Sequence, residues 1–171
     1  MTSTYSIWLV PDRDTDAYRT FDGMIGDLAR SYPDAPDFAP HVTLLGGVET
    51  DEATVAERTR ALVRDRDPVA LAFSDVSCST TAHQCVFVLV TPSVALLRLR
   101  RAAAEAFGRG SSTYVPHLSL LYSGTDPQDR VRVARSIDAE PLPDEIRVDA
   151  IEVVDTGRSV PEWRTVSRHP L

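Results

Sequence analysis

Two similar segments limit how this chain can fold more than any other feature of its sequence. Segments 38–46 and 114–122 each place a proline directly before a histidine, and a hydroxyl residue two positions after that histidine. In both cases the histidine lies nine residues before a good helix-capping residue, Thr50 in the first half and Asp126 in the second. The repeat predicts two halves with the same order of elements, related by a pseudo-twofold axis that brings the two motif strands side by side.

The spacing of apolar residues predicts helices that alternate with strands, and the length of 171 residues fits a single domain over residues 1–171. The expected strands cover 5–10, 42–45, 69–76, 86–90, 118–121, 146–154 and 163–166. The expected helices cover 12–31 and begin at 50–51, at 91–92 and at 126–127. We expect Val94, Leu97 and Phe107 to lie along the third of these helices.

Side-chain alternation along the two motif strands gathers their polar groups. Residues two apart in a strand share a face, so His41 lies with Thr43, and His117 lies with Ser119. The apolar residues between them face the other way and are expected to pack against the helices. The histidines and hydroxyls then project into a groove between the two halves.

Such a groove supplies what a phosphoryl-transfer site needs. Imidazole titrates near ~6.5, so at neutral pH one ring can be neutral while the other is protonated. The neutral ring can accept a proton from an attacking water, and the charged ring can donate a proton to the leaving oxygen. The hydroxyls of Thr43 and Ser119 can donate hydrogen bonds to the non-bridging phosphate oxygens. This chemistry requires no metal and no other cofactor.

Composition narrows the class of partner. The formal net charge of −7 argues against binding of long nucleic acid, for which a basic surface is the usual footprint. All 18 basic residues are arginine, and the absence of lysine excludes a Schiff base or a lysine nucleophile.

No apolar run approaches the roughly 20 residues of a membrane span, and we find no secretory signal. We expect a cytoplasmic protein that does not bind membranes. Cys78 and Cys85 are expected to be free thiols, with a disulfide as the alternative.

The sequence resembles the 2H phosphoesterase superfamily, whose mark is two His-x-Thr/Ser-x motifs, here 41–44 and 117–120. More narrowly, it is similar to the cyclic phosphodiesterase family that includes plant and yeast enzymes. Segments 5–8, 84–87 and 162–166 support this, so the likeness covers essentially the whole chain. The resemblance implies a bilobal α+β, LigT-like fold, with two pseudo-twofold-related lobes, antiparallel sheets that line a central cleft, and helices outside.

The resemblance also implies an activity. Enzymes of this family open 2′,3′-cyclic nucleotides or ADP-ribose 1″,2″-cyclic phosphate to a phosphomonoester, and usually leave a 2′-phosphate on the former. Carried over to this chain, His41 and His117 become the acid/base pair, Thr43 and Ser119 bind the phosphate, and Tyr122 stacks on the base. Spacing does not distinguish the acid from the base. The resemblance favours His41 as the acid.

Four aromatic or imidazole side chains outside the two motif tetrapeptides have more than one possible position. Strict alternation directs Tyr122 away from the groove, so it reaches the cleft only if the strand ends or twists after Leu121. Trp8 is a candidate cleft wall, because aromatic rings often line ligand pockets, with core packing as the alternative. His83 is expected in a solvated loop, with a contact at the edge of the pocket as the alternative, and His169 is expected at the surface.

Two rival functions stay open. One is a superfamily enzyme that processes RNA ends, either trimming a terminal cyclic phosphate or acting on a 2′–5′ linkage. The other is a non-catalytic module that binds a nucleotide in the same groove. The interpretation that we favour is a monomeric, metal-independent cyclic phosphodiesterase whose partner is a small nucleotide with a cyclic phosphate.

Overall fold

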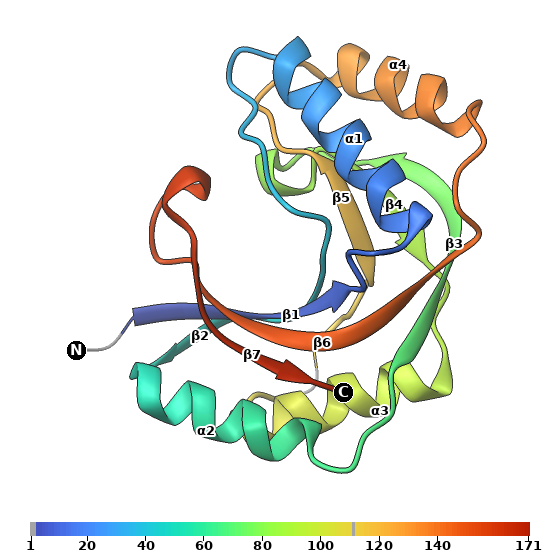
Figure 1. Ribbon diagram of the computed structural model, residues 1–171. Helices are drawn as coiled ribbons and strands as arrows, with labels where there is room; N and C mark the ends of the chain where they lie inside the picture. The colour runs from blue at the N-terminus through green and yellow to red at the C-terminus, as the bar shows by residue number, and fades with distance from the viewer. Residues whose placement is uncertain (1–2, 111) are drawn as a thin grey trace.

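The computed structural model describes residues 3–110 and 112–171, and it has the α+β architecture expected from the sequence (Figure 1). Its elements in chain order are β1 (Ser3–Pro11), α1 (Asp16–Ser31), β2 (Val42–Thr50), α2 (Glu52–Val63), β3 (Val69–Cys78), β4 (Val86–Val90), α3 (Val94–Ala106), β5 (His117–Leu121), α4 (Pro127–Asp138), β6 (Glu145–Asp155) and β7 (Arg164–Pro170). Two short 3₁₀ helices, η1 (Ala82–Gln84) and η2 (Val160–Glu162), precede β4 and β7.

Antiparallel pairing joins the strands into one curved sheet in the order β1-β2-β5-β4-β3-β6-β7. A further pairing of β1 with β6 closes all of these strands except β7 into a ring. The two motif strands, β2 and β5, are neighbours through the pair Val42–Leu118, so the predicted pseudo-twofold arrangement is confirmed. The sheets of the two lobes are continuous, because β6 is long enough to pair with β1 and β7 in one lobe and with β3 in the other.

The helices cover the outer faces of the lobes. In Figure 1, α1 and α4 lie above the part of the sheet that contains β3, β4 and β5, while α2 and α3 lie side by side below β2 and β7. Each half of the sequence therefore contributes one helix to each lobe. In α1, apolar residues at three- and four-residue spacing, Tyr18, Phe21 and Ile25, are buried, as the sequence pattern predicts.

Two helices begin later than the sequence suggests, because the residues before them take part in the sheet. The helix α1 begins at Asp16, where the Thr15 side chain accepts a hydrogen bond from the Tyr18 N–H. Before it, the N–H of Asp12 donates to the carbonyl of Arg147 on β6. A backbone hydrogen bond to a neighbouring strand thus keeps these residues out of the helix, although their helix propensity is acceptable.

The helix α3 shows the same effect with a consequence for packing. The N–H of Thr91 donates to Ala72 of β3, so the strand geometry persists and Ser93 becomes the cap. Val94 and Leu97, two of the apolar residues expected along this helix, are 67% and 46% exposed. The buried residues of this helix are Leu96, Leu99, Ala103 and Ala104.

Two further expectations concern the membrane and the thiols. In the part of the chain that the structure describes, no helix is both long enough and apolar enough to cross a bilayer. Cys78 is half-buried and Cys85 is buried, and both are free thiols, as predicted.

Candidate active site

The two motifs meet where β2 lies beside β5. The residues that directly follow the two histidines, Val42 and Leu118, are paired across the strands. Because the two strands are antiparallel, one step from this pair places Thr43 opposite His117. One step in the other direction places His41 opposite Ser119. Each histidine therefore lies across from the hydroxyl residue of the other motif, and the fold alone brings the four groups together.

Both imidazoles are held in the same way. The Nδ1 atom of His41 lies 2.8 Å from the carbonyl oxygen of Ala39, and Nδ1 of His117 lies 2.8 Å from that of Val115. A carbonyl oxygen can only accept, so in each neutral ring Nδ1 carries the proton and Nε2 has the free lone pair. The two backbone contacts thus assign the tautomer and leave the lone pair of Nε2 free of them in both rings.

The two histidines line one cavity of about 310 Å³. Trp8, Thr43 and Tyr122, all candidates from the sequence, also line it. Its remaining lining residues are Ser6, His83, Thr156, Arg158 and Trp163. The tertiary structure therefore gathers five of the six candidate site residues around one space.

Ser119 is the candidate that does not line this cavity. Its side chain is buried. The prediction that its hydroxyl binds the phosphate stays a prediction.

Trp8 packs against His41 and makes the environments of the two histidines different. The two rings are stacked, with centroids 3.6 Å apart and an interplanar angle of 15°. Burial lowers the pKa of His41 to about 4, partly opposed by its hydrogen bond to Ala39, and the charge of His117 lowers this pKa further. Burial also lowers the pKa of the half-buried His117. In the free protein at neutral pH, both rings are therefore neutral, and His41 is the harder one to protonate.

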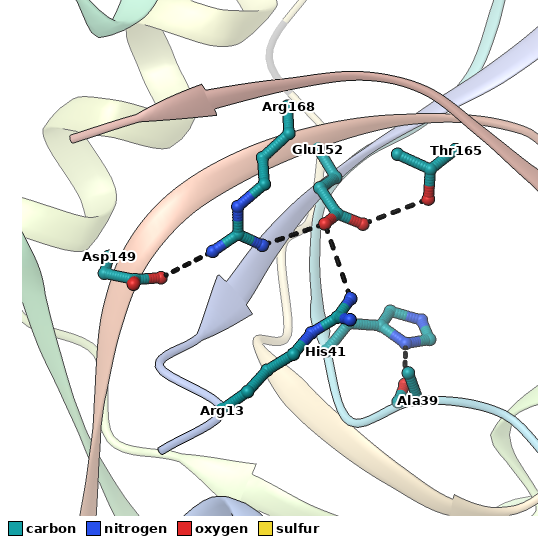
Figure 2. A network of polar contacts seen from close by, with 7 residues as sticks. All are labelled: Arg13, Ala39, His41, Asp149, Glu152, Thr165 and Arg168. Atoms are coloured by element: carbon teal, nitrogen blue, oxygen red, sulfur yellow. Dashed lines mark hydrogen bonds and ion pairs between the residues drawn. The ribbon is translucent and has the colours of Figure 1, made fainter. Parts of the chain in front are cut away.

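A buried carboxylate supports the strand that carries Trp8. Glu152 on β6 pairs in register with Trp8, and Figure 2 shows it among three polar partners. It accepts hydrogen bonds from Thr165 at 3.1 Å and from Arg168 at 2.9 Å, and Arg13 lies 3.6 Å away. These contacts compensate the buried negative charge, as such a group requires. The network thereby joins β6, β7 and the segment between β1 and α1 that carries Arg13.

Aromatic rings form the other wall of the cavity. Tyr122 stacks on Phe38 at a centroid distance of 4.0 Å and meets Trp163 and His83 edge-on. Its position in the cleft follows from the end of β5 at Leu121, the condition that the sequence argument set. Burial raises the pKa of Tyr122 to about 12, with the hydrogen bond to Ser119 as a smaller opposing effect. Tyr122 is thus a neutral hydrogen-bonding and stacking group throughout the physiological pH range.

Of the two remaining histidines, only His169 does not lie where the sequence suggested. His83 is exposed, as expected, and it also lines the cavity from η1, with its ring 6.2 Å from that of Trp163 between centroids. His169 is buried on β7 rather than at the surface, and its Nε2 lies 3.0 Å from the Ser167 hydroxyl. A terminal strand that pairs with β6 buries this residue.

Sequence reasoning missed Arg158, Gln84 and Arg130. Arg158 lines the cavity, and the amide of Gln84 lies 3.4 Å from Nδ1 of His117. Gln84 lies just before β4, the strand that pairs with β5 and its His117. The predicted hairpin that contains β4 could have indicated that Gln84 lies near this histidine. No local sequence pattern indicates Arg158. It lies on the segment between β6 and β7, and the tertiary structure brings this segment to the cavity.

Arg130 on α4 is buried and organises two loops next to the site. Its guanidinium donates to the carbonyl oxygens of Ser79 and Thr81 on one side, at 2.7 and 2.9 Å. On the other side it donates to Ser123 and Thr125, at 3.2 and 2.8 Å. The first loop leads into η1, which carries His83, and the second follows Tyr122 directly. One side chain therefore holds two cavity-lining segments together.

A two-lobed α+β fold with one His-x-Thr/Ser motif in each lobe, at a shared cavity, defines a 2H phosphoesterase. The family model described as the 2′-5′ RNA ligase superfamily matches residues 11–159. The chain belongs to this superfamily, which confirms the resemblance inferred from its two motifs.

Relatives and solved structures agree with this assignment. A cyclic phosphodiesterase of Arabidopsis thaliana is 26% identical over 127 residues, which cover 74% of this chain and 68% of the relative. A 2′,3′-cyclic-nucleotide 3′-phosphodiesterase of Kluyveromyces lactis is 23% identical and is matched over 75% of this chain and 68% of the relative. The fold matches E. coli LigT complexed with ATP at a TM-score of 0.62 and 14% identity, covering 100% of this chain and 99% of LigT.

Proposed function

We propose that this protein is a cyclic phosphodiesterase that hydrolyses a ribose cyclic phosphate to a phosphomonoester by two-histidine acid/base catalysis without a metal. The observation that carries the proposal is the pair of imidazoles on one cavity, each with Nδ1 held by a carbonyl and Nε2 free. The names of the Arabidopsis and Kluyveromyces relatives support the same activity.

In the proposed reaction, the Nε2 lone pair of one histidine takes a proton from water while the water oxygen bonds to phosphorus. The bond from phosphorus to one ribose oxygen breaks, and the second histidine gives its Nε2 proton to that oxygen. The products are a phosphomonoester and a free hydroxyl, and exchange with solvent restores both rings. Thr43, which lines the cavity, would donate its hydroxyl to a non-bridging oxygen, and Ser119 is the second hydroxyl proposed for this role.

The different burial of the two rings favours an assignment of roles opposite to the one that the resemblance suggests. His41, with a pKa lowered to about 4, is neutral over a wide pH range and suits the base. His117 is less buried, so it is the ring that takes up the catalytic proton more readily and suits the acid. The acid would then lie near the 3′ oxygen, if the product is a 2′-phosphate. This regiochemistry is supported by the name of the Kluyveromyces relative, a 3′-phosphodiesterase.

A single incubation tests the proposed function. The purified chain is mixed with EDTA and 2′,3′-cyclic AMP, and the products are followed by phosphorus NMR. We expect turnover to a phosphomonoester at the same rate with and without EDTA, with the 2′-phosphate as the main product. Loss of turnover with EDTA would contradict the metal-independent mechanism. Tight binding without hydrolysis would instead show a non-catalytic nucleotide-binding module.

The pH profile should reflect the two lowered pKa values. The base must be neutral, so kcat/KM should fall as the pH drops toward about 4, where His41 becomes protonated. The acid must be protonated, so kcat/KM should also fall as the pH rises above the pKa of His117, which is below 6.5. We expect a bell-shaped profile with its maximum between these limits, measured with 2′,3′-cyclic AMP. Circular dichroism at each pH provides the control for folding, and a maximum above pH 7 would refute the assignment.

A further inference from the structure

The cavity of the two histidines has one permanent positive charge at its wall. Of the described residues that line it, none is an aspartate or a glutamate, and only Arg158 is an arginine. Burial lowers the pKa of both imidazoles, so neither ring is charged in the free protein at neutral pH. A cyclic phosphate is an anion, and a guanidinium is the group that best matches phosphate oxygens. Arg158 is therefore the cation available to compensate a phosphate bound at this site.

Three other arginines near the site are engaged by buried acceptors. Arg13 lines a neighbouring cavity of about 270 Å³, but it pairs with the buried Glu152 at 3.6 Å. Arg100 donates to the carbonyl oxygen of the buried Leu44 at 3.0 Å. Arg130 donates to the four backbone carbonyls described above. Turning any of these side chains to a ligand would take a partner from a buried acceptor, which is costly.

Arg158, by contrast, has an exposed partner. One terminal nitrogen of its guanidinium lies 3.4 Å from Oε1 of Glu162, four residues further along the chain. The two side chains are 76% and 52% exposed. An ion pair that is open to water in this way is weak, so a phosphate can compete for the guanidinium.

Glu162 stays satisfied when Arg158 leaves it. Its second oxygen, Oε2, accepts a hydrogen bond from the Ser159 hydroxyl at 2.6 Å. This hydrogen bond, and after it the contact with Arg158, lower the pKa of Glu162, so the carboxylate is ionised at neutral pH. Because Glu162 is exposed, water can replace the guanidinium at Oε1. Release of Arg158 therefore costs little.

The main chain of Arg158 is anchored to the wall of the cavity. Its carbonyl oxygen accepts the indole N–H of Trp163 at 2.9 Å. Trp163 meets Trp8 edge-on at a centroid distance of 5.5 Å, and Trp8 stacks on His41. These contacts fix the point from which the Arg158 side chain extends, relative to the imidazole, while the side chain itself remains exposed.

We propose that Arg158 binds the reacting phosphate, and that Glu162 holds its guanidinium in the free protein until the phosphate takes the place of the carboxylate. The inference rests on the proposed function, because it assigns a further residue to the same reaction. The guanidinium makes one contact with Glu162, whereas its planar fork can donate two N–H groups to phosphate oxygens. Negative charge that builds up on the non-bridging oxygens during the reaction strengthens these contacts, so Arg158 stabilises the transition state.

The test measures kcat/KM for 2′,3′-cyclic AMP in variants of the pair. Arg158→Gln should lower kcat/KM by about 10- to 100-fold, the loss expected for a hydrogen bond to a charged group. Arg158→Lys should restore part of it, because lysine keeps the charge but not the fork. Glu162→Gln should raise kcat/KM by about two- to fivefold, as release from an exposed ion pair allows. In the Arg158→Gln background, Glu162→Gln should change nothing, since the carboxylate then has no guanidinium to hold.

Arg101 and Glu105 on α3 provide the matched control. They form an ion pair of the same spacing, at 2.8 Å, and their side chains are 82% and 64% exposed. Neither residue lines the cavity of the two histidines. Arg101→Gln and Glu105→Gln should each leave kcat/KM within about twofold of the parent, as surface substitutions away from a site do.

Binding without turnover separates recognition of charge from a structural role. Trp8 and Trp163 are the only tryptophans of the chain and both line the cavity, so their fluorescence reports a bound ligand. Arg158→Gln should weaken binding of adenosine 2′-monophosphate by about tenfold or more, and leave binding of adenosine, which has no phosphate, within about twofold. Equal loss of both ligands would show that Arg158 only supports the shape of the cavity.

Failure of this inference can be distinguished from failure of the proposed function. If the parent hydrolyses 2′,3′-cyclic AMP and Arg158→Gln is as active as the Arg101→Gln control, Arg158 does not bind the phosphate. If Glu162→Gln has no effect, or if its gain persists without Arg158, the exchange is refuted. A parent that binds adenosine 2′-monophosphate through Arg158 and hydrolyses nothing refutes the proposed function alone, and a parent that neither binds nor hydrolyses refutes both.

Discussion

Replacing either His41 or His117 by asparagine is expected to lower kcat for 2′,3′-cyclic AMP by about 10²–10⁴. Asparagine is chosen because its side-chain amide can take the place of Nδ1 and donate to the carbonyl of Ala39 or Val115, while it has nothing at the position of Nε2. The change therefore removes the proton-transfer atom and keeps the anchor. Steady-state rates of the two variants measure the effect directly.

The double variant provides a sharper test of the shared mechanism. Groups that act on one phosphorus atom are strongly non-additive, so the double variant should be little slower than the slower single variant. His169→Asn is the matched control: this histidine is also buried, but it lies on β7 and lines none of the cavities described above. It should keep kcat within about twofold, as expected for a residue outside a catalytic unit. Retention of more than a tenth of the parent activity in either single variant would contradict the two-histidine mechanism.

The second large effect concerns stability. Arg130→Met is expected to destabilise the protein by about 3 kcal/mol, because it removes the charged donor shared by four backbone carbonyls at Ser79, Thr81, Ser123 and Thr125. Methionine keeps much of the side-chain length, so lost packing contributes little. For a domain of this size, the expected fall in Tm is about 6–12 °C. Urea unfolding followed by circular dichroism measures the free energy of unfolding.

Arg132→Met is the matched control for this prediction. Arg132 lies on the same helix, two residues further along, but it is exposed and pairs only with the neighbouring Asp129. Exposed pairs of this kind contribute about 0–1 kcal/mol, so the control should unfold nearly as the parent does. Equal unfolding free energies for the two variants would show that Arg130 does not hold the loops together.

The repeated motif explains why so much of the site could be predicted. The period of two residues is a local property of a strand, and it places His41 on one face with Thr43, and His117 on one face with Ser119. The equal distance to the next helix cap is not kept, because Thr50 belongs to β2 and Asp51 caps α2. The twofold relation then follows from the similarity of the halves, and the pair Val42–Leu118 confirms it. Local patterns were less reliable at α3, where a hydrogen bond from Thr91 to Ala72 kept the chain in the sheet.

The sequence by itself determined the class of fold, the two motif strands and the identity of the paired histidines, because these depend on periodicity along the chain. Only the tertiary structure decided which ring is more buried, that Ser119 does not line the cavity of the two histidines, and that Arg158 does. Those properties arise from segments far apart in sequence that pack together, and burial and electrostatics depend on the distances between such segments rather than on local spacing.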